Sequence, residues 1–221
     1  MKDIIKFNSI SENIIHITLP NKKLLAETLI RFQEHYESPF DDIRGKIFTL
    51  GYVRSRGNRQ TGLNTYEGGK NFRPDWSGYN FPSSTLEPFI RGLFDPLTSN
   101  EKDVVNVLKY KTGSFYVIGT VEGVDPREAL EHELCHALYY VNKEYKEQCD
   151  NILKDYDLTF FFKWLEKIGY CQDVLLDEAQ AYLCADYDHL LSRKEEFEDH
   201  PFDIPRECHE RLKEVREKIS L

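Results

Sequence analysis

The spacing of hydrophobic residues changes near residue 121 of this 221-residue chain, and that change limits the folds open to it. In the first 120 residues several short segments alternate apolar and polar residues or are rich in β-branched residues, which is typical of strands. In the remainder, apolar residues recur every three or four positions, which is typical of helices. The pattern predicts an α+β fold with a small mixed or antiparallel N-terminal sheet and a helical C-terminal half. We expect one domain over residues 1–221, strand-rich over 1–121 and helical over 122–221, because no repeat or linker divides the chain.

Turn residues and capping residues bound the individual elements. One helix start is marked by a predicted capping box of Asp125 and Glu128, with Pro126 at the first helical position. The aromatic and Gly-rich segment 54–82 is too long for a passive connection, so we expect it to be functional or to contain a hairpin. Strands are predicted at residues 4–7, 13–19, 46–53 and 114–120, and helices at residues 21–36, 83–94, 99–109, 126–141, 158–168, 174–191 and 205–219.

Charge and composition exclude several classes of protein. The 29 basic and 38 acidic side chains give a net charge of −9. Residues 1–110 carry 15 basic and 13 acidic side chains, which leaves 14 and 25 for residues 111–221. Such an acidic C-terminal half repels phosphate, so we expect no nucleic-acid partner. The locally basic stretch from Arg44 to Arg73 is either a solvated hairpin or a surface for an acidic partner.

The location of the protein can also be predicted. No apolar run approaches the roughly 20 residues that cross a bilayer, and the charged N-terminus lacks the pattern of a secretory signal. The five cysteines form no CxxC pair, which argues against a disulfide framework and a zinc ribbon. We therefore expect a cytoplasmic protein without a membrane partner.

The chain contains one motif with a defined chemistry, the HExxH string from His132 to His136. Histidines four residues apart project from the same face of a helix and can share a metal ion. Glu133 lies beside them, where a carboxylate can take a proton from a metal-bound water and pass it to a leaving amine. The motif sits in the helix predicted at 126–141, directly after a strand.

A third ligand is needed, because a catalytic zinc takes three protein ligands and keeps one open position. A third histidine ten residues after His132 is excluded, since Asn142 stands there. Glu178, in a later helix, is the natural replacement. Its neighbour Asp177 is placed to bond His132 or His136 and to fix the ring tautomer.

With these residues the chain resembles the gluzincins, zincin metallopeptidases in which an HExxH helix and a glutamate on a downstream helix hold the zinc. The resemblance covers roughly residues 114–190 and implies one Zn²⁺ per chain, bound by His132, His136 and Glu178, with Glu133 as general base. It also implies that the strand at 114–120 is an edge strand that pairs with an extended peptide or protein substrate.

Two further features remain open at this stage. Many gluzincins use a Tyr or His beyond the third ligand to bond the oxyanion, and Tyr182, Tyr187 and His189 are the candidates here, with Tyr182 one turn beyond Glu178. The aromatic loop at 66–82 either closes over the site or packs its aromatics onto the domain surface.

The sequence thus predicts a zinc-dependent metallopeptidase in which Glu133 activates a zinc-bound water. Two His and one carboxylate also form the site of non-haem iron oxygenases and hydroxylases, although Glu133 has no evident role there. The remaining alternative is a non-catalytic, zinc-containing peptide-binding module.

Overall fold

The computed structural model describes residues 5–56, 63–66, 71–74, 76–123, 126–168, 170–192 and 206–221. The strands are β1 (Lys6–Ser11), β2 (Ile14–Leu19), β3 (Leu63–Tyr66), β4 (Asn71–Pro74), β5 (Gly78–Pro82) and β6 (Tyr116–Val121). The helices are α1 (Lys22–Glu37), α2 (Leu50–Arg56), α3 (Glu87–Ile90), α4 (Ser99–Leu108), α5 (Pro126–Val141), α6 (Lys143–Leu153), α7 (Thr159–Ile168), α8 (Leu175–Ala185), α9 (Tyr187–Ser192) and α10 (Arg206–Glu217), with 3₁₀ turns η2 (Ser83–Leu86) and η3 (Gln172–Val174). This arrangement confirms the predicted α+β fold with a small N-terminal sheet and a helical C-terminal half.

A four-stranded mixed sheet forms the centre of the N-terminal part, in the order β1-β2-β6-β5. β2 and β6 run parallel, while the outer pairs β1–β2 and β5–β6 are antiparallel. Within the described residues, β6 therefore lies between two strands, and the prediction of an edge strand at 114–120 is wrong. The edge of the sheet on this side is β5, whose formation depends on pairing with β6 rather than on a local pattern.

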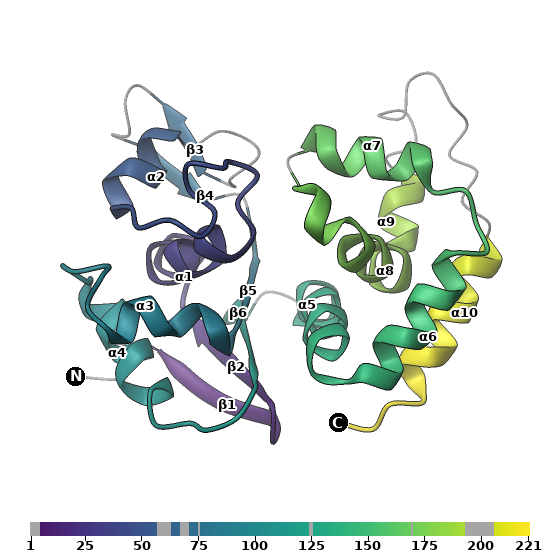
Figure 1. Cartoon of the computed structure of the whole chain (residues 1–221), viewed down its shortest axis with the longest axis horizontal. Helices are drawn as coiled ribbons and strands as arrows, with labels where there is room; N and C mark the ends of the chain where they lie inside the picture. Colours follow the sequence, from purple (N-terminus) through teal and green to yellow (C-terminus); the bar gives the residue numbers. More distant parts are fainter. Residues whose placement is uncertain are drawn as a thin grey trace.

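The two faces of the sheet bury different residues because side chains alternate along a strand. Tyr79 and Val117 face the core that α1 covers, whereas Tyr116 and Ile118 belong to the core of the helical half. Figure 1 shows α1 on one side of strands β5 and β6 and α5 on the other. The sheet is thus a partition between two hydrophobic cores, and α5 is the helix of the second core that lies against it.

A buried ion pair ties α1 to α4. Nε and Nη2 of Arg31 each lie 2.6 Å from a carboxylate oxygen of Glu101, and both side chains are buried. Arg31 also donates to the carbonyl oxygen of Phe94 at 2.9 Å. Glu101 in turn completes a capping box with Thr98 at the start of α4. These contacts tie α1 to α4 and to the segment before α4.

The helical half is built around α5 and α8, which pack against each other (Figure 1). α10 returns from the end of the chain and packs against both α6 and α8. In the described part of the chain, none of the helices has the length and apolar character needed to span a bilayer.

Several predicted elements need correction. The predicted strand at 46–53 is wrong, because Thr49 accepts a hydrogen bond from the backbone N–H of Tyr52 at 3.0 Å and α2 begins at Leu50. The predicted helix at 174–191 is divided into α8 and α9 at Asp186. The helix predicted at 83–94 is a 3₁₀ turn followed by α3, which ends at Ile90.

Other differences concern what the sequence pattern left out. The sequence reasoning missed α6, although Asn142 caps it by accepting from the backbone N–H of Tyr145 at 3.0 Å. The segment 54–82 contains the hairpin β3–β4, as expected, and also β5. Asp125 of the predicted capping box lies outside the described residues.

Candidate metal centre

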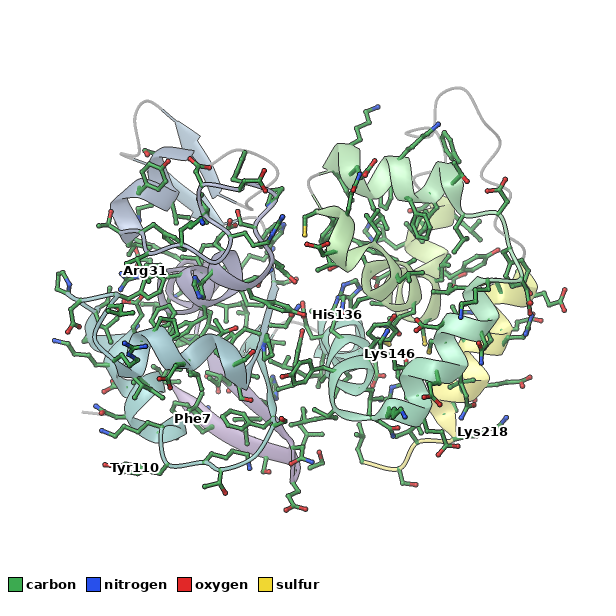
Figure 2. The ribbon with its side chains drawn as sticks, viewed as in Figure 1. Phe7, Arg31, Tyr110, His136, Lys146 and Lys218 are labelled. Carbon is green, nitrogen blue, oxygen red and sulfur yellow. The ribbon has the colours of Figure 1, made fainter. Side chains whose placement is uncertain are left out.

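The two histidines of the HExxH motif meet on one face of α5. Their Nε2 atoms are 3.0 Å apart and their rings pack edge to face, with centroids 4.8 Å apart. His136 is buried and His132 is partly exposed. Figure 2 shows His136 near the boundary between the sheet-containing part and the helical half.

Glu178 on α8 completes the cluster. Its Oε1 lies 3.6 Å from Nε2 of His136, and its Oε2 lies 3.9 Å from Nε2 of His132. The side chain is 2% exposed, and Oε2 has no hydrogen-bond partner. Among the residues that the structure describes, His132, His136 and Glu178 are the group of potential ligands close enough to share a metal ion.

The donor set and its geometry fit a zinc ion. Ligand atoms 2.0–2.2 Å from a tetrahedral ion lie about 3.3–3.6 Å from one another. The separations here lie on both sides of that spacing: 3.0 Å between the two Nε2 atoms, and 3.6 and 3.9 Å from Nε2 of His136 and of His132 to different oxygens of Glu178. A buried carboxylate oxygen without a partner is costly, and a cation between the three side chains would satisfy it. Two nitrogens and one oxygen also leave a fourth position for water.

Two aspartates orient the histidine rings. Nδ1 of His132 lies 2.7 Å from Oδ2 of Asp186, and Nδ1 of His136 lies 2.8 Å from Oδ1 of Asp177. An ionised carboxylate only accepts hydrogen bonds, so each Nδ1–H donates, and Nε2 is the nitrogen that each ring would offer to an ion. Asp177 thus takes the place that the sequence predicted for it, whereas Asp186 follows α8 at a position that no sequence pattern marked.

The electrostatics of the cluster favour positive charge. Burial lowers the pKa of His132, but the hydrogen bond and charge of Asp186 outweigh it and raise the pKa above the usual value. Burial also lowers the pKa of His136, but the charges of Asp177 and Glu178 outweigh this effect and raise the pKa well above its usual value. Burial raises the pKa of Glu178 to about 7 although the two histidines lower it. These carboxylates would also attract a cation.

The carboxylate of Glu133, the expected general base, is held in place by residues of the sheet. Its Oε2 accepts a hydrogen bond from Nδ2 of Asn80 on β5 at 2.7 Å, and its side chain is buried. A Cβ atom at Gly78 would come within 2.1 Å of Oε1, so this residue of β5 leaves the room that Glu133 occupies. Sequence reasoning did not identify Asn80 or Gly78, because their role depends on the pairing of β5 with β6.

The three oxyanion candidates lie in different places. The ring of Tyr182 packs edge-on against His132, with centroids 4.8 Å apart, and its hydroxyl is 3.1 Å from that of Tyr170. Tyr187 instead stacks on His209, and His189 is exposed on α9. Of the three, Tyr182 is the one in contact with a residue of the metal cluster.

One further acidic residue belongs to the surroundings of the site. Glu37, at the end of α1, has a pKa raised well above its usual value by burial and then by the charge of Glu178. Tyr170 has a pKa raised first by burial and then by Glu178. Sequence analysis did not identify Glu37, which lies directly after the helix predicted at 21–36, as a residue close to Glu178.

No family model matches this chain, and no curated protein or solved structure matches it either.

Proposed function

We propose that this protein is a zinc-dependent metallopeptidase that hydrolyses peptide bonds in peptides or proteins. The observation that carries the proposal is the convergence of His132, His136 and Glu178 with a buried carboxylate, Glu133, on the same helix as the two histidines. A metal site that served only to stabilise the fold would need no carboxylate held beside it. The fixed Glu133 also favours hydrolysis over the iron oxygenase, in which it has no role.

In this proposal the chain supplies three functions. His132, His136 and Glu178 hold the zinc, and Asp186 and Asp177 keep the histidine tautomers that leave Nε2 free. Bound zinc supplies Lewis acidity toward a peptide carbonyl and lowers the pKa of water. Glu133 takes the proton from the attacking water and delivers it to the leaving amine.

The proposal assigns substrate alignment to β5 instead of β6. β5 is the edge strand and carries Gly78 and Asn80 beside Glu133. The N–H of Asn80 donates to Oε1 of Gln33 on α1 at 3.2 Å, so it points away from β6 and is already paired. The outer edge near Gly78 is the part of β5 that we propose aligns an extended peptide.

The proposal also places the enzyme in the cytoplasm. All five cysteines are free and buried, which suits a reducing compartment.

Metal content is the first test. Elemental analysis of the purified chain should give about one zinc per chain, with loss of zinc in His132→Ala and Glu178→Ala. His189→Ala is the matched control, because this histidine is exposed and outside the cluster. Iron in place of zinc would favour the oxygenase, and full zinc in Glu178→Ala would contradict its role as a ligand.

Turnover is the second test. The zinc-loaded chain should cleave members of a mixed peptide library, and Glu133→Gln should retain zinc and lose about 10²–10⁴-fold in rate. Zinc binding without cleavage by the wild-type chain would favour the binding module, and an active Glu133→Gln would refute the role of Glu133.

A further inference from the structure

We propose that Asn80, held by Tyr116, is a positioning residue that fixes the carboxylate of Glu133. The catalytic meaning of this inference rests on the proposed peptidase function, whereas the contact between the side chains can be tested without it. The sheet would then supply part of the active site as well as part of the core.

A chain of two hydrogen bonds links the three side chains. The hydroxyl of Tyr116 on β6 donates to Oδ1 of Asn80 at 2.6 Å, and Nδ2 of Asn80 donates to Oε2 of Glu133 at 2.7 Å. All three residues are buried. Short hydrogen bonds between buried groups restrict the side chains strongly, because water cannot replace the partners.

The carboxylate at the end of this series of hydrogen bonds determines their direction. A carboxylate oxygen accepts, so the NH₂ group of the Asn80 amide faces Glu133 and the amide oxygen faces Tyr116. The hydroxyl of Tyr116 then donates to that oxygen, and burial, which raises the pKa of Tyr116 well above its usual value, keeps the proton in place. Asparagine suits this position because its side chain accepts at one end and donates at the other.

Neighbouring contacts fix the position of the Asn80 side-chain amide. The backbone N–H of Asn80 donates to Oε1 of Gln33, which ties β5 to α1. Gly78, two residues earlier on the same face of β5, lies against Oε1 of Glu133. One carboxylate oxygen of Glu133 is thus bonded by Asn80 and the other lies against a glycine, which limits the orientations that the carboxylate can take.

Two single substitutions test the positioning role. Asn80→Asp keeps the shape and replaces the donor by a second carboxylate, so kcat should fall by about 10²-fold with KM changed by less than about threefold. Tyr116→Phe removes the donor to Asn80 and should lower kcat by about tenfold. Both variants should retain one zinc per chain, because neither residue is a ligand.

Matched controls are available outside the site. Asn100→Asp makes the same change at a partly buried asparagine whose amide donates to Thr28. Tyr139→Phe removes a tyrosine hydroxyl that donates to Asp150 on α6. Both controls should leave kcat unchanged, even if they alter the melting temperature.

A double substitution gives a readout that needs no substrate. Asn80→Asp places two carboxylates against each other and should lower the melting temperature. Adding Glu133→Gln again pairs an amide with a carboxylate, but the amide donor is now at position 133 and the acceptor at position 80. The double variant should therefore recover most of the lost melting temperature. The recovered chain should remain inactive, because the general base is absent; recovery of stability without activity separates the contact from its catalytic use.

Other results would overturn the inference. A rise in KM with unchanged kcat in Asn80→Asp would place Asn80 in substrate binding, and an unchanged kcat and KM would remove it from catalysis. No recovery in the double variant would refute the contact with Glu133. A zinc-loaded wild-type chain without hydrolysis would refute the peptidase proposal and with it the catalytic role of Asn80, while the melting temperatures still decide whether the contact exists.

Discussion

Oδ1 of Asp177 lies 2.8 Å from Nδ1 of His136, and the next residue on α8, Glu178, lies beside Nε2 of the same ring. Two adjacent residues of α8 therefore reach one histidine from two sides. Asp177 fixes the ring through Nδ1, and Glu178 lies next to Nε2. A further hydrogen bond from Nε2 of Gln180 to Oδ1 of Asp177, at 3.0 Å, holds the aspartate. The first turn of α8 therefore carries one of the three proposed ligands and orients another.

We expect that removing the aspartate that accepts a hydrogen bond from Nδ1 of a histidine weakens metal binding. Asp186→Ala should lower zinc affinity by about 10–100-fold, because His132 loses the partner that fixes its tautomer. Competition with a chromophoric chelator measures this affinity. Asp188→Ala is the control, since this aspartate is exposed on α9. An affinity of Asp186→Ala equal to that of the control would contradict the assignment.

A buried acid in α1 should make stability depend on pH. Glu34 is 2% exposed, and burial raises its pKa to about 7, with an opposing hydrogen bond from Ser38. The folded state then binds more protons than the unfolded state between about pH 4.5 and 7, so this group lowers stability as pH rises through that range.

The substitution Glu34→Gln removes this titration. The variant should be more stable than the wild type by up to about 3 kcal/mol at pH 8 and nearly equal to it at pH 4.5. Urea unfolding at both pH values measures the difference. Glu87→Gln, at an exposed position on α3, should show no such change, and a pH-independent difference for Glu34→Gln would refute the explanation.

Breaking the buried ion pair of α1 should be costly. Arg31→Met leaves the carboxylate of Glu101 buried without its cation, and we expect a loss of about 3–5 kcal/mol in the free energy of unfolding. Denaturant unfolding is the measurement, with Arg206→Ala, from an exposed pair with Glu210, as a control expected to lose under about 1 kcal/mol. Equal losses in the two variants would show that the pair adds nothing beyond a surface contact.

A glycine in the central strand should be sensitive to size. A Cβ atom at Gly119 would lie 2.1 Å from Cδ1 of Leu29, so Gly119→Ala should destabilise the fold by about 1–3 kcal/mol. Leu29→Ala removes the atom that clashes, so Gly119→Ala should lower the melting temperature less in a Leu29→Ala background than in the wild type. Gly51→Ala is the control, because its Cβ would meet only Thr49 at 3.8 Å. A Gly119→Ala chain as stable as the wild type would mean that α1 can shift freely.

Sequence reasoning succeeded where the information is local. Histidine spacing on a helix fixes which side chains share a face, and this predicts His132 and His136 as a pair. Glu178 is predicted from the need for a third ligand and from the resemblance to gluzincins. The structure brings these three residues together. Asp177 could be placed for the same reason, as the neighbour of Glu178.

Sequence reasoning failed where a contact depends on a partner distant in the chain. Asn80 and Gly78 join the site only through the pairing of β5 with β6, and Asp186 only through the turn that follows α8. The segment 46–53 has residues that favour strands, yet α2 begins at Leu50, with Thr49 accepting a hydrogen bond from the backbone N–H of Tyr52. Local preference is a weak guide when a single capping bond or a neighbouring strand decides the outcome.

The alternation along β5 has a consequence for changes in chain length. Gly78 and Asn80 face Glu133, while Tyr79 and Phe81 fill the core under α1. A one-residue shift in the pairing of β5 with β6 would turn the tyrosine toward Glu133 and the asparagine into the apolar core. A single substitution in β5 changes one face of the sheet, whereas a shift of its register would remove the contacts on both faces, those around Glu133 and those of the core under α1.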